Sequence, residues 1–173
     1  MKTPEITYSK ILMLLLASGL IGLMACSESP APPMFDPVPD TAAELQEVVA
    51  DYIATYQSRN DWDKFLSFYS DSLYFLDINL KIDFHDKEGF MEFYDWPNPN
   101  FRKVTPDQQT FLVEDLIVKD NTAIIKGRFE PFYWKDDLKE WTDLFTMWLH
   151  FDDDHKIIRQ YDFIKYPKQF LPE

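Results

Sequence analysis

The 173-residue chain has few glycines, one cysteine and few basic residues, and each shortage excludes a class of function. It contains 4 glycines, and neither the Walker A pattern nor the glycine pattern of dinucleotide-binding folds occurs. Lys and Arg number 17 against 30 Asp and Glu, which gives a formal net charge of −13. Because phosphates are neutralised by clustered basic residues, we expect no nucleic-acid partner.

The one cysteine, Cys26, follows an apolar run over residues 11–25. That run is shorter than the roughly 20 residues that a membrane span needs, and it predicts a signal peptide over residues 1–25. Its end, Leu23-Met24-Ala25-Cys26, resembles the lipobox of bacterial lipoproteins, which implies a palmitate-type lipid on Cys26. The alternative is an ordinary secretory signal with a coincidental cysteine. If the lipid is attached, the mature chain has no free thiol, disulfide or cysteine-bound metal.

Residues 26–40 follow as a proline-rich tether, with five prolines among residues 27–40. The predicted domain, residues 41–173, carries 15 basic and 26 acidic side chains, a net charge of about −11. It also holds 27 of the 29 aromatic residues, enough for one core and the wall of a cavity. We expect a lipid-anchored protein in the envelope of a Gram-negative-type bacterium, at the outer membrane, with the domain in the periplasm or at the cell surface.

Hydrophobic spacing predicts helices in the first half of the domain and strands in the second. A capping box at Thr41 and Glu44 opens a long helix, Asn60 or Asp61 can cap a second, and Asp86 a third. The third helix is expected over residues 87–95, and a strand over residues 73–80 precedes it. Four further strands are expected as an antiparallel meander over residues 111–119, 122–135, 140–152 and 156–165. Helices laid on one face of a sheet make an α+β layout.

This order, with the turn Asn60-Asp61-Trp62, the pair Phe93-Tyr94 and the strand Lys156-Ile-Ile-Arg-Gln-Tyr-Asp162, resembles the nuclear transport factor 2-like superfamily. The likeness extends over about residues 45–165 and is nearest to the SnoaL-like and ketosteroid-isomerase-like branches. It implies a cone in which three N-terminal helices pack on a strongly bent antiparallel sheet. It also implies a pocket that is open at one end of the cone.

Strand alternation directs Phe129, Phe145 and Met147 into the cone, and Asp143 shares their parity. Asp77 interrupts an apolar strand, where a carboxylate either lies at the cavity mouth or has a raised pKa. Either condition suits a general base.

The resemblance implies more specific roles. It places Asp77 at the position of the catalytic base and Tyr52 at that of the tyrosine that donates to the oxyanion. It also directs Gln160 and Asp162 inward. The resemblance places Met147 where that family has a protonated aspartic acid, and methionine cannot donate a hydrogen bond. The alternative is that Asp77 and Asp162 only accept hydrogen bonds from loops, or pair with Lys81 or Arg159.

The histidines do not predict a metal site. Asp83 and His85 share a strand face without a third ligand, and His155 lies in an acidic turn that lacks calcium-loop spacing. We therefore expect neither a metal nor a cofactor.

Four large aromatic residues are expected on or near the outer face of the sheet: Phe132, Trp134, Trp141 and Trp148. Exposed tryptophans are typical of interfaces, so we expect a homodimer through this face.

Two functions are consistent with the sequence. The first is a binding module that holds a small apolar ligand or an envelope protein in an aromatic-lined pocket. The alternative is a cofactor-free isomerase, cyclase or dehydratase with Asp77 as general base and Tyr52 as donor. Met147 in place of an acid favours the first, because losing one oxyanion donor costs on the order of a hundredfold in rate.

Overall fold

The computed structural model describes residues 41–168 and 171, so the expected signal peptide, the lipidation residue Cys26 and the tether lie outside the described residues. By its internal contacts Pro37–Glu173 is one compact unit. It has its own hydrophobic core, which is the ordinary condition for a segment to fold by itself.

The three expected helices are present, as α1 (Thr41–Ser58), α2 (Trp62–Ser67) and α3 (Lys87–Tyr94). Their predicted caps are confirmed for α2 and α3. Asp61 Oδ1 accepts the backbone N–H of Lys64 at 2.9 Å, and Asp86 Oδ1 accepts that of Gly89 at 2.8 Å. These carboxylates satisfy N–H groups that have no partner inside the helix.

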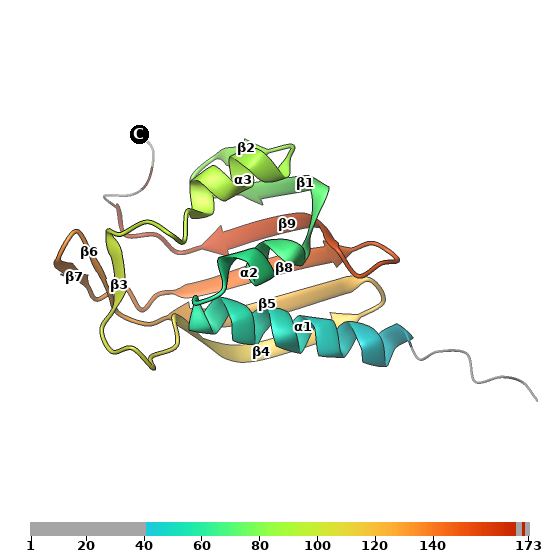
Figure 1. Ribbon diagram of the computed structural model, residues 1–173, viewed down its shortest axis with the longest axis horizontal. Helices are drawn as coiled ribbons and strands as arrows, with labels where there is room; N and C mark the ends of the chain where they lie inside the picture. Colours follow the sequence, from blue (N-terminus) through green and yellow to red (C-terminus); the bar gives the residue numbers. More distant parts are fainter. Residues whose placement is uncertain (1–40, 169–170, 172–173) are drawn as a thin grey trace, which may run out of the picture. The chain divides into compact units, whose positions relative to one another are not determined.

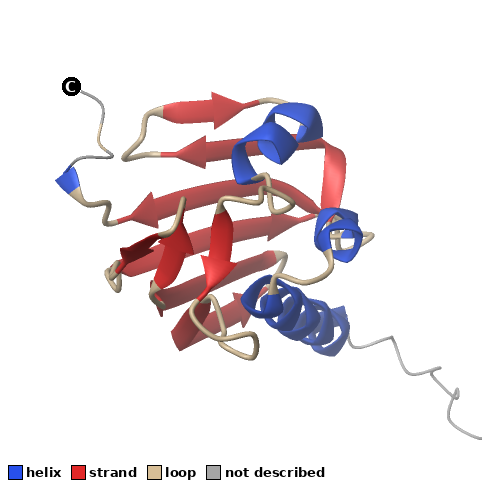
Figure 2. Ribbon diagram, turned by 60° about the vertical axis from the view of Figure 1, so that its left-hand side comes forward, coloured by secondary structure: helices blue, strands red, loops and turns tan. Residues whose placement is uncertain are grey.

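The six-stranded sheet has the order β2-β1-β9-β8-β5-β4, and it curves beside the helices (Figures 1 and 2). Its strands are β1 (Tyr69–Asp77), β2 (Ile82–Phe84), β4 (Phe111–Lys119), β5 (Thr122–Phe129), β8 (Leu144–Phe151) and β9 (Ile157–Ile164). The meander β4, β5, β8 and β9 is antiparallel as predicted.

The sheet as a whole is mixed rather than antiparallel, because β1 runs parallel to β9, with Asp77 opposite Asp162. Pairing with the last strand is a contact distant in the sequence, which local patterns do not reveal. The same ladder begins at Tyr69 and Ile157, so the strand starts before the predicted residues 73–80.

A second, three-stranded sheet is formed by β3 (Phe101–Lys103), β6 (Phe132–Trp134) and β7 (Asp137–Lys139). The expected single strand over residues 122–135 is divided here because Pro131 has no N–H for a ladder hydrogen bond. The chain leaves the large sheet after Phe129, and β6 pairs with β3 and β7 instead. The small sheet lies at one end of the large one (Figure 1).

The core fills the space between the helices and the face of the large sheet that they cover. Its fully buried large side chains include Tyr52, Phe65, Phe75, Phe111 and Phe145. Among the described residues, no helix has both the length and the apolar character that crossing a membrane requires.

Candidate functional site

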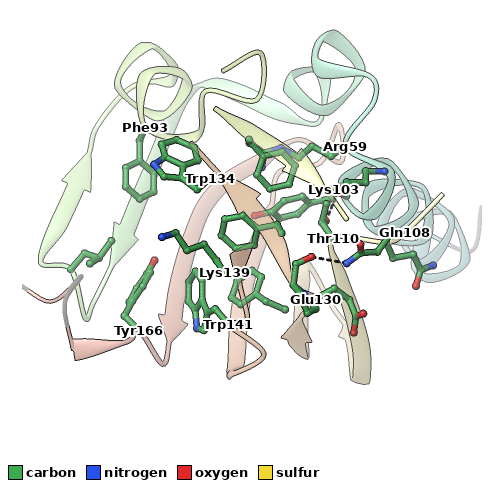
Figure 3. Close-up of a pocket in the computed structure, with 17 residues that line it drawn as sticks. Arg59, Phe93, Lys103, Gln108, Thr110, Glu130, Trp134, Lys139, Trp141 and Tyr166 are labelled. Carbon is green, nitrogen blue, oxygen red and sulfur yellow. Dashed lines mark hydrogen bonds between the residues drawn. The ribbon is translucent and has the colours of Figure 1, made fainter. Parts of the chain in front are cut away.

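A cavity of about 400 Å³ opens at the end of the domain where the small sheet lies. Its lining comes from the end of α1, from α3, from both sheets and from the segment after β9 (Figure 3). Eight aromatic side chains form most of the wall: Tyr56, Phe93, Phe101, Phe129, Phe132, Trp134, Trp141 and Tyr166. The site is therefore suited to an apolar molecule with rings.

Four charged side chains belong to the lining: Arg59, Lys103, Glu130 and Lys139. Basic groups thus outnumber acidic ones here, whereas residues 41–173 as a whole are strongly acidic. Lys139 has an acidic neighbour, since its Nζ lies 3.6 Å from Asp137.

The segment between β3 and β4 is held against the cavity by side-chain hydrogen bonds. Gln108 Nε2 donates to the carbonyl oxygen of Pro131 at 2.8 Å, and Thr110 Oγ1 donates to that of Tyr56 at 3.0 Å (Figure 3). These bonds tie α1, the loop and the strand connection into one wall.

Arg59 follows the last residue of α1 with a φ of 47°, in the left-handed region. Its Cζ lies 4.0 Å from the ring centroid of Phe101 and 5.3 Å from that of Trp96. Burial lowers the pKa of the guanidinium, and its buried Nε has no hydrogen-bond partner.

The expected outer-face position is wrong for three of the four aromatic residues. Phe132, Trp134 and Trp141 line the cavity. Phe132 and Trp134 lie in the small sheet because the chain changes sheet at Pro131, and Trp141 precedes β8, so the alternation of the large sheet applies to none of them. Trp141 also donates Nε1–H to the carbonyl oxygen of Lys165 at 3.0 Å. Trp148 is 40% exposed and is not part of the lining.

Asp77, the predicted general base, is fully buried at the end of β1. Its Oδ1 accepts the backbone N–H groups of Asn79 and Leu80, at 3.0 and 2.9 Å. Its Oδ2 accepts the hydroxyl of Tyr166 at 2.5 Å. Asp77 is not part of the lining, but Leu80 and Tyr166 are. The carboxylate thus lies one hydrogen bond behind the cavity wall.

Tyr52, the predicted oxyanion donor, belongs to a different buried network and does not line the cavity. Its hydroxyl lies 3.0 Å from that of Tyr69, which donates to Gln160 Oε1 at 2.8 Å. Gln160 Nε2 donates to Asp162 Oδ1 at 2.9 Å and to the Tyr94 hydroxyl at 2.8 Å. Tyr94 in turn donates to Asp162 Oδ2 at 2.9 Å.

The network contains a carboxylic acid with an altered pKa. Burial raises the pKa of Asp162 to about 7, while hydrogen bonds from Gln160 and Tyr94 act in the opposite direction. Burial likewise raises the pKa values of Tyr52 and Tyr94 well above their ordinary value. These hydroxyls remain protonated and serve as donors.

The remaining predicted pocket residues divide between the cavity, the core and the surface. Phe129 lines the cavity, and Phe145 packs behind it with ring centroids 4.8 Å apart. Met147 is buried, and its Sδ lies 3.8 Å from Gln160 Nε2. Asp143 is partly exposed and pairs with Lys165 at 2.6 Å, so it does not join the buried acids.

Sequence reasoning missed Tyr56, Arg59 and Tyr166 as cavity residues. Tyr56 recurs at helical spacing with Tyr52, which predicts packing in the core, and Tyr166 follows the last expected strand. Arg59 lies in the break between the first two expected helices, and its neighbours in the sequence do not indicate a cavity.

No metal site is evident within residues 41–168 and 171, since no group of three or more His, Cys, Asp or Glu side chains could hold an ion there. Asp83 and His85 lie 3.1 Å apart and are largely exposed.

No protein-family model matches the chain, and no curated protein matches its sequence. Several solved structures share its fold. A protein from Shewanella putrefaciens that is named as a SnoaL-like polyketide cyclase has a TM-score of 0.59 at 13% identity, over 71% of this chain and 90% of that chain. A protein from Kribbella flavida named as a ketosteroid isomerase has a TM-score of 0.52 at 14% identity, over 76% and 84%.

A third structure with this fold is TerC, co-crystallised with polyporic acid. Its TM-score is 0.53 at 14% identity, over 70% of this chain and 91% of that chain. Identities this low show the fold alone, and they confirm the expected nuclear transport factor 2-like fold.

Proposed function

We propose that the domain binds a small, largely apolar, ring-containing ligand in the cavity beside the small sheet. The observation that carries this proposal is the wall of eight aromatic side chains around a space of about 400 Å³. Ligand pockets are typically about 300 to 1,000 Å³, mostly apolar, with a few polar groups that orient the ligand.

Two further points support binding. The polar groups that meet the cavity are few and come from separate elements, as in sites that fix the orientation of one molecule. TerC, which has the same fold, was co-crystallised with polyporic acid, an organic acid of the kind that an aromatic-lined cavity would suit.

The test uses Pro37–Glu173 and the neutral fluorophore N-phenyl-1-naphthylamine. Trp134 is 36% exposed and lines the cavity, whereas Trp148 is 40% exposed and does not, which makes the two a matched pair. Trp134→Ala should weaken probe affinity on the order of tenfold, since an aromatic contact is removed. Trp148→Ala should leave the affinity unchanged.

Fluorescence titration of the two variants and the parent measures these affinities. Absence of probe binding to the parent, or equal loss in both variants, would contradict binding in this cavity.

Catalysis is a second candidate, favoured by one observation. Tyr166 lines the cavity and donates to Asp77, so the predicted base is connected to the space where a substrate would lie. Against this, Asp77 accepts two backbone N–H groups of the turn that follows β1, as a structural acid does, and Tyr52 belongs to a separate network. Binding without chemistry therefore remains the primary proposal.

The two candidates differ in what Asp77→Asn does. Under binding alone, this variant keeps its affinity for the neutral fluorophore within about twofold, and a Δ5-3-ketosteroid is not converted to the conjugated enone by either protein. Conversion by the parent that is lost in Asp77→Asn would establish the catalytic candidate instead. The absorbance of the enone reports the reaction.

We further propose that Cys26 carries the lipid that anchors this domain to the cell envelope. The support is the lipobox-like sequence before the cysteine and the proline-rich segment after it, both in the part of the chain outside the described residues. Cys26→Ser should move the protein from the membrane fraction to the soluble fraction and block processing after Ala25. Persistence of the variant in washed membranes would contradict the anchor.

A further inference from the structure

We infer that the ligand of this cavity is an organic anion, an apolar body bearing one carboxylate-type group, and that Arg59 receives the negative charge. This inference rests on the proposed function, because it names the class of ligand that the same cavity takes. It is carried by the contacts of Arg59, the charges of the lining and the placement of the rings.

Within the described part of the chain, Arg59 is a charged side chain without a compensating anion. Among residues 41–168 and 171, no carboxylate lies within ion-pair distance of its guanidinium, and its buried Nε makes no hydrogen bond. Asp95 is the acid whose charge acts on it, but the Oδ2 of Asp95 accepts from Asn98 at 2.7 Å. Burying a cation in this way is costly unless a partner arrives.

The surrounding rings hold the guanidinium in place. Phe101 and Trp96 pack against Arg59, with Cζ 4.0 Å and 5.3 Å from their centroids. The rings attract the positive charge but do not accept its N–H groups as a carboxylate oxygen would. A carboxylate matches the guanidinium, since two of its oxygens can accept two parallel N–H groups.

The charge of the lining supports an anion as well. Lys103 also lines the cavity, and burial, with a smaller contribution from the positive charge of Arg59, lowers the pKa of Lys103. Two cations that repel each other in one apolar site are both stabilised by a bound anion. Among the described residues Glu130 is the one carboxylate in the lining, so the site is locally basic in an acidic domain.

The test compares two fluorophores that differ by a single charge. 8-Anilino-1-naphthalenesulfonate is the sulfonated form of neutral N-phenyl-1-naphthylamine, so the ratio of their affinities isolates the contribution of the anion. Pro37–Glu173 should bind the sulfonate on the order of tenfold or more tighter than the neutral probe, because hydrogen bonds to charged groups are the strong ones.

Arg59→Gln should reduce this ratio on the order of tenfold, because the sulfonate loses a charged donor and the neutral probe does not. Arg102→Gln is the matched control. Cζ of Arg102 lies 4.0 Å from the ring centroid of Tyr133, and both residues belong to the small sheet. Arg102 is exposed and does not line the cavity. It should leave the ratio unchanged.

The outcomes separate the two proposals. If the parent does not bind the neutral probe, the proposed function fails. If the parent binds the neutral probe, and its affinity for the sulfonate is no higher than its affinity for the neutral probe, the anion inference is overturned and the proposed function stands. The same holds if Arg59→Gln and Arg102→Gln alter the ratio equally. The parent ratio needs no variant, so it decides whether the cavity prefers an anion even if Arg59→Gln does not fold.

Discussion

Asp162 is a buried acid surrounded by hydrogen-bond donors. Gln160 and Tyr94 donate to its two oxygens, and Asp77 lies opposite it on the neighbouring strand. Burial outweighs the donors, and the negative charge of Asp77 adds to its effect on the pKa. At neutral pH the carboxyl of Asp162 is therefore close to its titration midpoint, which links the stability of the core to pH.

Asp162 should make the protein less stable as the pH rises. Its pKa increases from 3.8 to about 7 on folding, so between about pH 4 and pH 7 the folded state holds a proton that the unfolded state has lost. The contribution to the free energy of unfolding is full below this window, falls through it, and totals on the order of 4 kcal/mol. Asp162→Asn should remove this fall. Urea denaturation at both ends of the window measures it.

The exposed Asp153 provides the control, since Asp153→Asn should leave the pH dependence as it is in the parent. A slope that persists in Asp162→Asn would assign the titration to another group.

Asp77 should act as a structural residue whatever else it does. Asp77→Ala leaves three donors without their acceptor, those of Asn79, Leu80 and Tyr166, and should lower the free energy of unfolding by about 3 kcal/mol. Asp77→Asn retains one oxygen for the turn and should cost about 1 kcal/mol. Equal losses in the two variants would show that the turn bonds contribute nothing.

Among the strands, β5 is constrained by a close approach at Gly127. A Cβ there would lie 2.3 Å from the carbonyl oxygen of Leu112 and 2.8 Å from Cζ of Phe145. The register of β4 and β5 shifts between Val113 and Asp115, next to the residue paired with Gly127. Glycine at this position therefore allows two backbones to approach at an irregular point of the sheet.

Gly127→Ala should lower the free energy of unfolding by about 3 kcal/mol, because the added methyl meets backbone that cannot move aside. Gly89→Ala is the comparison. Its Cβ would meet the ring of Phe84 at 2.6 Å, which is a side chain and can shift, and the helix gains from alanine. Chemical denaturation should rank Gly127→Ala as the more damaging. The opposite ranking would mean that the β4–β5 pairing adjusts freely.

Elements defined by neighbouring residues were predictable. Caps such as Asp61 and Asp86 act within three residues, and the meander strands are separated by short turns, so local sequence describes them. The small sheet was not predictable in this way. β3 and β6 are far apart in the sequence, and the spacing of hydrophobic residues does not indicate that they pair. Pro131 does indicate where the strand expected over residues 122–135 must end.

At the scale of the molecule, the outer face of the large sheet still carries apolar side chains. Leu144, Trp148 and Phe163 are exposed there, on β8 and β9, and the rings of Trp148 and Phe163 lie 5.8 Å apart. Such a surface is typical of an interface. The expected homodimer remains a prediction, now with Trp148 rather than Trp134 or Trp141 at its centre.

Trp148→Glu should convert a dimer of Pro37–Glu173 into a monomer, because it places a charge in an apolar interface on both subunits. Light scattering after size-exclusion chromatography gives the mass. Trp134→Glu, in the cavity, should leave the mass as it is in the parent. A parent that is already monomeric would contradict the homodimer.

The sequence by itself determined the helices, their caps, the antiparallel meander and the abundance of aromatic residues in an acidic domain. These follow from spacing and composition, which depend on neighbours along the chain. Only the tertiary structure decided which aromatics line the cavity, that Asp77 lies one hydrogen bond behind it, and that Arg59 faces it with no carboxylate partner among the described residues. The reason is physical: a cavity forms where elements far apart in sequence leave space between them, and the change of sheet at Pro131 reversed the faces that strand alternation had assigned.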